Sequence, residues 1–441
     1  MRLQGYVPLY QNFESFYTRN IYRRICHGWN MPIASMAGAV IDVVDRIPVN
    51  YNLSFDFPGT TTRAINMGSY NYLGFAENTG PRAESVERVL RAEGVGVGSC
   101  RHELGTTVLH QRLERTVADF LGVEDSVVFG MGFATNSTNI PVLAGRGSLI
   151  ISDELNHASM ILGCRLTGSV IRVFKHNDMR DLERQLRTAV VDGQPRTHRP
   201  WKKIIIFVEG IYSMEGTCVN LPEVIQLKNK YKAYLYLDEA HSVGAMGPTG
   251  RGIVDHYGCD PHDVDLLMGT FTKSFGAAGG YLAGRKQLID YIRIHSHSFA
   301  YATSMSAPVA QQVLAVFEAL QSAEGQERVE KLARNTHYFR RRLRQMGFLV
   351  YGDNDSPVVP MMIYFPGKIV AFVKGALEMG VAAVGAGFPA TPLIESRVRF
   401  CLSAAHTKEM LDQALDVTSV LGERLHVKYS REKQSADPVA Y

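Results

Sequence analysis

Short apolar segments alternate with segments of helical periodicity through the middle of the chain. The apolar segments have the length and composition of strands buried on both faces. Between two of them Leu182, Leu186 and Val190 recur every four residues, as on one face of a helix. This alternation predicts an α/β domain with a mostly parallel, seven-stranded sheet. The expected strands are 126–129, 148–152, 170–174, 204–208, 234–237, 265–268 and 280–283.

A different pattern begins near Pro308. Two helical repeats, through Val313 and Val329, precede short apolar segments and further helices, an order typical of an α+β unit. Its expected strands are 348–351, 358–365 and 398–403, with one helix ending near Gly380 and another capped by Thr407. We therefore expect an N-terminal helix and arm (1–60), a large domain (61–307), a smaller C-terminal domain (308–428) and a tail of disordered composition (429–441).

The first residues carry an unusually aromatic helical face. Apolar side chains recur every three or four positions over residues 9–25, from Leu9 to Ile25. Such a helix either packs on the body of the protein or docks on a partner or a membrane surface. No apolar run reaches about 18 residues, so neither a transmembrane helix nor a signal peptide is expected in this chain.

Composition narrows the functional class. The 441 residues are 46% hydrophobic and 20% charged, as in a soluble globular protein, and the formal charge of +4 includes no polybasic block. Binding to nucleic acid is therefore not expected. The six cysteines have no CxxC spacing, which argues against a disulfide framework or a zinc site and favours a reducing compartment. We expect no metal site.

Polar residues follow the predicted strands where parallel strands place their ligands, beyond the carboxyl ends. A glycine loop at 130–136 opens a helix and offers free amides for a phosphate. Further polar segments follow other strands, at 153–159, 209–216, 238–242 and 269–280. These segments should line one site.

Lys273 lies in the last of these segments, among hydroxyl-bearing and glycine residues. A lysine held at a strand edge can form a Schiff base with an aldehyde, although a polar hairpin with a solvated lysine would look similar. Together with the other segments, Lys273 indicates a site for pyridoxal 5′-phosphate (PLP). Asp238 would keep the pyridine nitrogen protonated, His157 would stack on the ring, and His241 would hydrogen-bond near the phenolic oxygen. The phosphate would be held by the amides of Gly132 and Phe133 and the hydroxyls of Thr270 and Thr272.

Other interpretations of these segments are weaker. Asp238–His241 also spells a helicase box, but the chain has no G-x-x-x-x-G-K-[ST] phosphate loop. No H-E-x-x-H zinc motif is present.

The sequence leaves the roles of two features open at this point. The segment containing Tyr70 and Asn71 forms either a substrate wall or a turn, and Arg101 is either a structural clamp or an anion contact.

Five segments together carry a resemblance to a known family. The chain resembles the α-oxoamine synthases, a family of fold-type I PLP enzymes, and within it the long-chain base 2 type of catalytic subunit of the sphingolipid branch. The resemblance runs over nearly the whole chain. The segments that carry it are 68–74, 152–159, 209–216, 237–242 and 269–276.

The resemblance implies roles for individual residues. Lys273 would be the lysine that holds the cofactor, and Ser213 would lie with His241 near the polar edge of its ring. Asn71 and Arg399 match positions that engage the amino-acid carboxylate. Tyr70 would lie beside them at the substrate, and Arg397 is the weaker candidate for the carboxylate.

The resemblance also implies an activity, the decarboxylative condensation of L-serine with palmitoyl-CoA to 3-ketodihydrosphingosine. Alternatives are a relative that uses glycine or alanine with a short acyl-CoA, or a non-catalytic scaffold subunit; such subunits lack the Schiff-base lysine. By resemblance, the chain would pair with a lysine-less sister subunit of long-chain base 1 type. It would lie at the endoplasmic reticulum membrane, its catalytic domain facing the cytosol, with a membrane segment upstream of the region present here.

Overall fold

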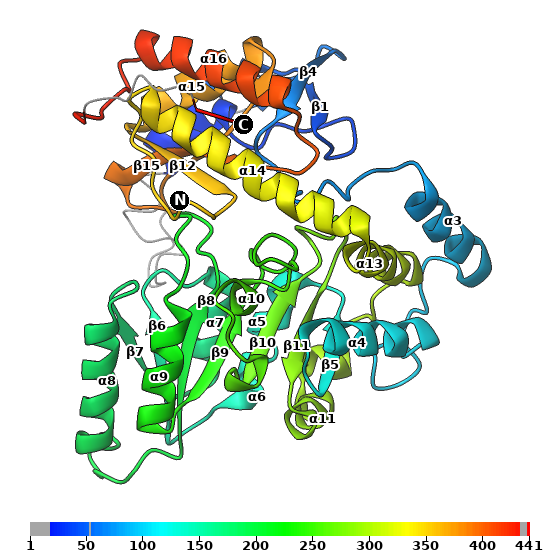
Figure 1. Cartoon of the computed structure of the whole chain (residues 1–441), viewed down its shortest axis with the longest axis vertical. Coiled ribbons are helices and arrows are strands. Elements are labelled where there is room, and N and C mark those ends of the chain that lie inside the picture. The colour runs from blue at the N-terminus through cyan, green and yellow to red at the C-terminus, as the bar shows by residue number, and fades with distance from the viewer. Residues whose placement is uncertain (1–17, 53, 433–438) are drawn as a thin grey trace, which may run out of the picture.

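The computed structural model describes residues 18–52, 54–432 and 439–441. Figure 1 shows a lower part built on a large sheet and an upper part with smaller sheets and long helices. Two consecutive helices, α13 (Ala307–Leu320) and α14 (Ala323–Gln345), lead the chain from the lower part to the upper one.

The lower part contains the predicted seven-stranded sheet. Its strand order is β5-β11-β10-β9-β8-β6-β7, and β11 alone runs against the others, so the sheet is mostly parallel. All seven predicted strands are confirmed to within about two residues at each end. They are β5 (Asp125–Phe129), β6 (Ser148–Asp153), β7 (Val170–Phe174), β8 (Lys203–Glu209), β9 (Tyr234–Asp238), β10 (Leu266–Thr270) and β11 (Gly280–Gly284).

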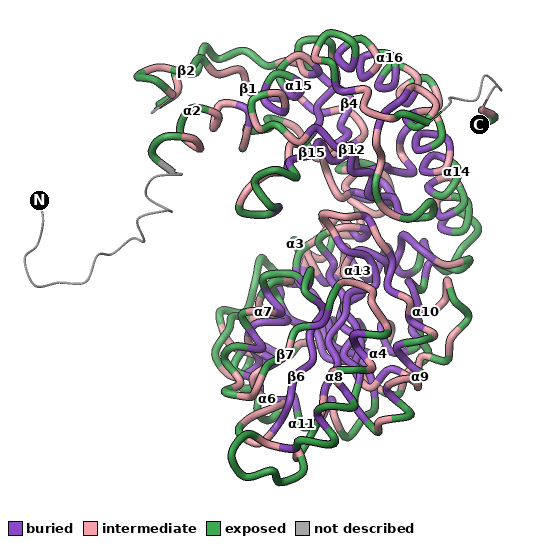
Figure 2. The backbone as a smooth tube through the Cα atoms, turned by 90° about the vertical axis from the view of Figure 1, so that its left-hand side faces the viewer, coloured by how far each residue is buried: buried purple, intermediate pink, exposed green. Residues whose placement is uncertain are grey.

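Successive strand residues point to opposite faces of this sheet, and both faces are buried along the central strands, whereas the edge strand β7 leaves Val173 55% exposed. Leu235 and Leu237 belong to the core on one face and Tyr236 to the core on the other. Figure 2 shows buried backbone concentrated in these strands. One face is covered by α4 (Val108–Leu121), α8 (Met179–Asp192), α9 (Leu221–Tyr231) and α10 (Ile253–His256). The other is covered by α5 (Gly132–Ser137), α6 (Ile140–Leu143), α7 (Ala158–Leu166), α11 (Lys286–His295) and α12 (His297–Tyr301).

The helix predicted from the four-residue repeat is α8, with one difference. Leu182 and Leu186 are fully buried against the sheet, so truncating either to alanine would cost about 2–5 kcal/mol. Val190, the third member of the repeat, is exposed, and Ala189 takes the buried position. A period of 3.6 residues rather than 4 explains the shift over two turns.

The upper part contains two three-stranded sheets and a two-stranded one, in which β2 (Ile47–Val49) pairs antiparallel with β3 (Ser54–Asp56). In one three-stranded sheet, β15 (Ser396–Cys401) pairs antiparallel with β12 (Val358–Tyr364) and β14 (Val384–Ala386). In the other, β4 (Thr61–Asn66) lies between β1 (Val40–Val44) and β13 (Val381–Ala382). Helix α14 packs against α16 (Lys408–Arg424), while α15 (Pro366–Glu378) packs against β13 and β15. The remaining elements are η1 (Thr18–Tyr22), α2 (Arg23–Ile25), η2 (Cys26–Gly28), α3 (Pro81–Glu93), η3 (Pro261–Asp263) and η4 (Leu393–Glu395).

Three expectations need comment. The predicted strand 348–351 is wrong, because Val350 forms only an isolated bridge with Met361; Pro360 has no amide hydrogen with which to extend the ladder. The boundary predicted at residue 61 assigns β4 to the large domain, whereas β4 pairs with β13. Of the predicted aromatic helix 9–25, residues 18–25 are helical and the rest lies outside the described residues.

The predicted tail 429–441 is described only at its two ends, and both ends make contacts. The Tyr429 hydroxyl donates to the carbonyl of Ile363 (3.3 Å), and the Tyr441 hydroxyl donates to Asn335 (2.8 Å). Residues 433–438 lie outside the described part.

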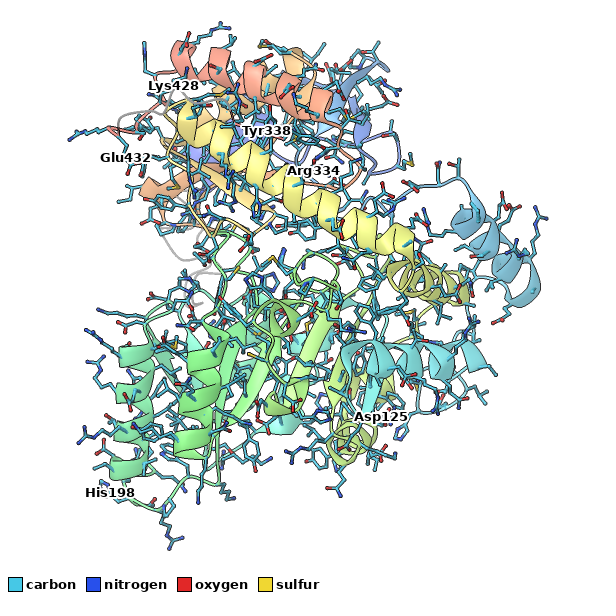
Figure 3. The ribbon with its side chains drawn as sticks, in the orientation of Figure 1. Asp125, His198, Arg334, Tyr338, Lys428 and Glu432 are labelled. Carbon is cyan, nitrogen blue, oxygen red and sulfur yellow. The ribbon has the colours of Figure 1, made fainter. Side chains whose placement is uncertain are left out.

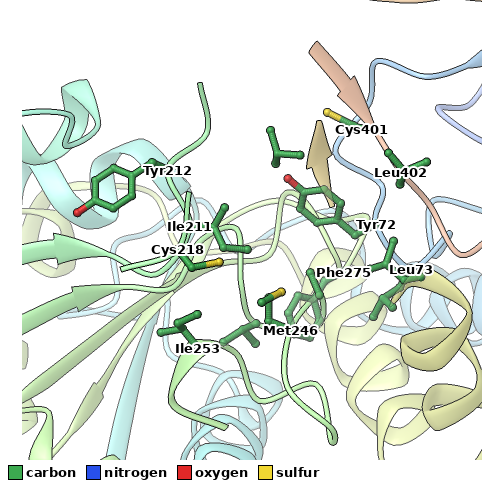
Figure 4. Close-up of a cluster of buried hydrophobic side chains, with 14 of the residues drawn as sticks. Tyr72, Leu73, Ile211, Tyr212, Cys218, Met246, Ile253, Phe275, Cys401 and Leu402 are labelled. Atoms are coloured by element: carbon green, nitrogen blue, oxygen red, sulfur yellow. The ribbon is translucent and has the colours of Figure 1, made fainter. Parts of the chain in front are cut away.

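The segment after β4 joins the two parts of the molecule. Buried side chains from both parts meet here, among them Tyr72 and Leu402 from the upper side and Ile211 and Ile253 from the lower side (Figure 4). The Ser403 hydroxyl donates to the carbonyl of Asn71 (2.6 Å). Within the described residues, no helix combines the length and the apolar character that crossing a bilayer requires.

His406 makes the stability of this junction depend on pH. Its Nδ1 accepts from the Ser403 amide (3.2 Å) and its Nε2 donates to the carbonyl of Asn66 (3.0 Å), so the neutral ring satisfies both bonds. Burial lowers the pKa of His406 to about 4 from 6.5, against the opposing effect of the Asn66 carbonyl. Between these values the unfolded chain binds a proton that the folded chain does not, and stability falls as pH is lowered. The full window corresponds to about 3 kcal/mol.

We therefore expect His406→Gln to lose less stability than the wild type when the pH is lowered from 7.5 to 5. Urea denaturation followed by intrinsic fluorescence measures both losses. Equal losses in the two proteins would contradict the assignment. His262, an exposed histidine, provides the matched control as His262→Gln.

Candidate active site

A cavity of about 270 Å³ lies at the carboxyl ends of the central strands. It is lined by all four residues predicted to be catalytic and by the four predicted to hold a phosphate. Sequence segments more than 100 residues apart therefore converge as the parallel sheet requires. The predicted residues that line it are Gly132, Phe133, His157, Asp238, His241, Thr270, Thr272 and Lys273; Asn136, Ser159 and Glu209 join them.

Lys273 is held in the turn that connects β10 to β11. Its amine lies 5.7 Å from the centre of the Tyr70 ring. Burial lowers the pKa of Lys273, and the charges of Asp238 and Glu209 oppose the shift. A lowered pKa gives the amine more of its neutral form, which is the form that attacks a carbonyl or accepts a proton.

Asp238 ends β9 and is buried, and each of its carboxylate oxygens accepts one hydrogen bond. One oxygen accepts from the Asn136 amide (2.8 Å) and the other from the backbone N–H of Ala240 (2.9 Å). The Tyr236 hydroxyl donates to the amide oxygen of Asn136 (2.6 Å), which orients the NH₂ group of Asn136 toward Asp238. Asn136 had no predicted role. The sequence feature that could have indicated this role is the position of Asn136, four residues after Gly132 and one turn into the helix.

His157 begins α7 and faces the cavity. Its Nδ1 is 2.7 Å from the Ser159 hydroxyl, and its backbone N–H donates to the Glu209 carboxyl group. The ring of Phe133 lies 6.0 Å away, edge on. Burial and the charge of Lys273 lower the pKa of His157, while Asp238 opposes the shift; burial has the largest effect. Burial, then the charge of Asp238, raises the pKa of Glu209 well above its usual value.

His241 is paired with the segment after β4. Its Nδ1 lies 2.8 Å from the Tyr72 hydroxyl, and the Tyr70 ring packs against it edge on at 4.9 Å. Burial, followed by the charges of Lys273 and Arg399, holds the pKa of His241 well below its usual value. The imidazole is therefore neutral, and its Nε2 remains for a hydrogen bond in the site.

The glycine loop and the Lys273 turn approach each other closely. A Cβ added at Gly132 would come within 2.5 Å of the Thr270 hydroxyl, so only glycine allows this approach. The hydroxyls of Thr270 and Thr272 are 2.9 Å apart. In this structure the Thr270 hydroxyl donates to the carbonyl of Gly279 (2.9 Å). Rotated toward the cavity, the two hydroxyls would join the backbone amides at the start of α5 in a set of donors that fits a phosphate. With Lys273 and Asp238 in the same cavity, the residues fit PLP.

Arg397 and Arg399 lie two residues apart on one face of β15 but differ in how they are hydrogen-bonded. Arg397 donates to the carbonyls of Met214 (3.0 Å) and Glu395 (2.9 Å), and also pairs with the Glu395 carboxylate (3.2 Å). Arg399 stacks on the Tyr70 ring at 4.5 Å, and one of its terminal nitrogens makes two long contacts, to the carbonyl of Ser213 (3.3 Å) and to the sulfur of Met214 (3.6 Å). Its buried Nε has no hydrogen-bond partner in the described part of the chain. Arg399 is thus the less committed of the two arginines, although it is not among the residues that line the cavity.

The remaining predicted residues lie around the cavity rather than in its wall. Ser213 approaches the site through its backbone carbonyl. Asn71 donates to the carbonyl of Ala37 (3.0 Å) and accepts from the amide of Ala76 (3.3 Å), so its side chain braces a turn. Arg101 is a structural clamp, because it is buried in bonds to Glu114 (2.8 Å) and to the carbonyl of Val128 (3.0 Å).

Comparison with known proteins identifies the family to which the chain belongs. Residues 62–417 match the model of aminotransferase class I and II. Serine palmitoyltransferase 3 of Homo sapiens is 56% identical over 99% of this chain and 80% of its own length. Long chain base biosynthesis protein 2a of Arabidopsis thaliana is 50% identical over 97% of this chain and 88% of its own length.

Solved structures agree with these matches. A high-resolution structure of SPT with its PLP internal aldimine has a TM-score of 0.82 at 25% identity, covering 95% of this chain and 100% of that one. Serine palmitoyltransferase of Sphingomonas wittichii gives 0.82 at 26% identity, covering 96% and 100%. An 8-amino-7-oxononanoate synthase from Francisella tularensis, at 19% identity, shares the fold. The chain belongs to the serine palmitoyltransferase family of class I and II aminotransferase-fold proteins.

Proposed function

We propose that the cavity catalyses the PLP-dependent condensation of L-serine with a long-chain acyl-CoA, with loss of carbon dioxide. One observation carries the assignment of the chemistry: the amine of Lys273 and the buried carboxylate of Asp238 line one cavity. The relatives named serine palmitoyltransferase support the choice of serine and an acyl-CoA as substrates. The first step of sphingolipid synthesis is this reaction.

The chain supplies each contact that PLP requires. Lys273 would hold the cofactor through its amine, Asp238 would face its ring nitrogen, and His157 would pack on its ring. Gly132, Phe133, Thr270 and Thr272 would bind its phosphate. When bound, the cofactor supplies an electron-accepting ring that stabilises negative charge on the α-carbon of an amino acid. Asn136 and the Ala240 amide keep Asp238 in place for this pairing.

The protein's own groups then handle protons and charge. The neutral amine of Lys273 accepts the α-proton of serine, a role that its lowered pKa favours. Arg399 binds the serine carboxylate through its uncommitted Nε, and Tyr70 holds the guanidinium in place by stacking. His241 stays neutral and offers one nitrogen to the polar edge of the site while Tyr72 fixes the other.

Two alternatives are less well supported. A synthase acting on glycine or alanine shares the fold, but the example among the solved structures is only 19% identical. A non-catalytic scaffold subunit would lack the Schiff-base lysine, whereas Lys273 is present and faces the cavity. The catalytic serine-using assignment is therefore preferred.

We also propose that the chain pairs with a lysine-less sister subunit at the endoplasmic reticulum membrane, with the site facing the cytosol. The segments 99–105 and 299–304 run side by side, joined by the Ser304 amide bonding to the Ser99 carbonyl (3.0 Å). They and the start of α4 expose large apolar side chains: Leu104 is 83% exposed, Val108 79% and Tyr301 82%. Such a patch supports a protein partner. The eukaryotic origin of the similar relatives supports the location.

Lys273→Ala should lower the kcat of condensation by about 10²- to 10⁴-fold, because the base is missing. CoA release measures activity, and the absorbance of the bound cofactor measures attachment. Lys286→Ala, which removes an exposed lysine paired with Asp290, is the control and should behave as the wild type. Retained condensation in the Lys273 variant would overturn the proposed chemistry.

Arg399→Lys should raise the KM for L-serine roughly 10- to 100-fold, the effect of losing one strong hydrogen bond to a charged group. The KM for the acyl-CoA should stay the same. Arg397→Lys should lower thermal stability instead, because the Arg397 side chain is committed to backbone carbonyls. A serine KM that responds to Arg397 and not to Arg399 would reverse the assignment.

Leu104→Asp should weaken co-purification with the sister subunit, since a charge would be buried in the contact. Val191, which is 76% exposed on α8, offers a matched control as Val191→Asp. Pull-down of tagged chains measures the pairing, and fractionation of cell membranes measures the location. Undiminished pairing of the Leu104 variant would exclude this surface, and recovery outside the endoplasmic reticulum fraction would exclude the location.

A further inference from the structure

A series of three hydrogen-bonded side chains lies at the ends of β6 and β7, outside the cavity. Asp153 ends β6 and is only 2% exposed. The Nδ1 of His176 is 3.0 Å from a carboxylate oxygen of Asp153, and the Nε2 is 2.8 Å from the Thr217 hydroxyl. Because a carboxylate only accepts, the Nδ1 of His176 donates to Asp153, and its Nε2 pairs with the Thr217 hydroxyl. The mechanism described above uses none of these groups.

The His176 ring is held firmly from several sides. Its backbone N–H donates to the Glu154 carboxylate (2.8 Å), and its ring packs edge on against Tyr212 with centres 4.4 Å apart. Asp153 is held in turn by the backbone amides of Leu155 (2.9 Å) and Asn177 (3.2 Å). The ring is therefore a rigid attachment point at the edge of the main sheet.

The attachment point holds one loop, residues 211–218, whose ends meet through a bridge between Ile211 and Cys218. His176 holds this loop at Thr217, and the Asn177 amide donates to the carbonyl of Cys218 (2.7 Å). On its upper side, the Cys218 amide donates to Asp353 (2.5 Å). The loop is thus fixed between the two parts of the molecule.

The same loop contacts both arginines of β15. The carbonyl of Ser213 accepts from Arg399 (3.3 Å), and the sulfur of Met214 lies 3.6 Å from the same guanidinium nitrogen. The carbonyl of Met214 accepts from Arg397 (3.0 Å). The location of the loop therefore helps to set, together with the Tyr70 ring, where the Arg399 guanidinium rests.

We propose that His176, with Asp153 and Thr217, is a positioning residue for amino-acid recognition. It sets the loop that places Arg399, and through Arg399 it sets the affinity for the substrate carboxylate. The inference rests on the proposed role of Arg399. A displacement of an ångström in a binding group changes rates by up to about 10²-fold, so a side chain this far from the reacting atoms has a measurable effect.

The test compares variants of the holoenzyme, purified with its sister subunit where pairing requires it. His176→Asn keeps a polar side chain but cannot reach both partners, and Thr217→Val removes the hydroxyl at constant volume. Thr217→Ser restores the hydroxyl. His198→Asn is the matched control, since His198 is exposed at the lower tip of the molecule (Figure 3). Its left-handed backbone suits asparagine.

We expect His176→Asn and Thr217→Val each to raise the serine KM about 5- to 30-fold, with kcat and the acyl-CoA KM within about 2-fold of wild type. Calorimetric titration of L-serine should show the same loss of affinity. Thr217→Ser and His198→Asn should match the wild type. The double variant should lose no more than the worse single variant, because both break one series.

The inference fails if the serine KM and the serine affinity are unchanged in Thr217→Val, which tests the series even where His176→Asn does not fold. It also fails if kcat and both KM values change together, which would indicate general damage. Arg399→Lys, measured in parallel, separates the two proposals. If Arg399→Lys raises the serine KM and the His176 series does not, only this inference is wrong; if Arg399→Lys has no effect, the proposed carboxylate site is wrong.

Discussion

The burial of the Asp238 carboxylate opposite the Lys273 amine is the interaction on which the site depends. A buried carboxylate is costly unless hydrogen bonds compensate it, and here Asn136 and the Ala240 amide do so. Tyr236 in turn orients Asn136. These hydrogen bonds offset the cost of removing the Asp238 carboxylate from water. The negative charge of Asp238 remains available to a cationic ring nitrogen. Lys273, in the same cavity, has its pKa lowered by the same burial.

The site also depends on how the two parts of the molecule are placed relative to each other. The main sheet supplies Lys273, Asp238 and the histidines, whereas the residues proposed to contact the amino acid, Arg399 and Tyr70, belong to β15 and to the segment after β4. Tyr70 lies between them, with its ring close to both the Lys273 amine and the Arg399 guanidinium. The loop 211–218 provides a second connection. On the proposed assignment, substrate selection would depend on the junction between the two parts, and the chemistry on the main sheet.

The lower part of the fold was predictable because its physical causes are local. A strand covered on both faces must be apolar throughout, so the central strands of the sheet were found from their composition. Parallel strands also place their carboxyl ends together, so the polar residues after them had to share a site. The strand predicted at 348–351 failed because a strand needs a partner able to continue the ladder, and Pro360 prevents this.

The sequence by itself determined the chemical groups of the site, since Lys273, Asp238, His157 and His241 each follow a strand that can be recognised. Only the tertiary structure decided how those groups are held and which neighbours are committed elsewhere. The local sequence does not distinguish Arg101, Arg397 and Arg399. Bonds to other segments engage the first two, whereas the Nε of Arg399 has no hydrogen-bond partner among the described residues. The same holds for Asn71, which braces a turn, and for β4, which pairs with β13. The reason is that the hydrogen-bond partners of these side chains lie tens to hundreds of residues away in the sequence. The local sequence pattern therefore cannot identify them.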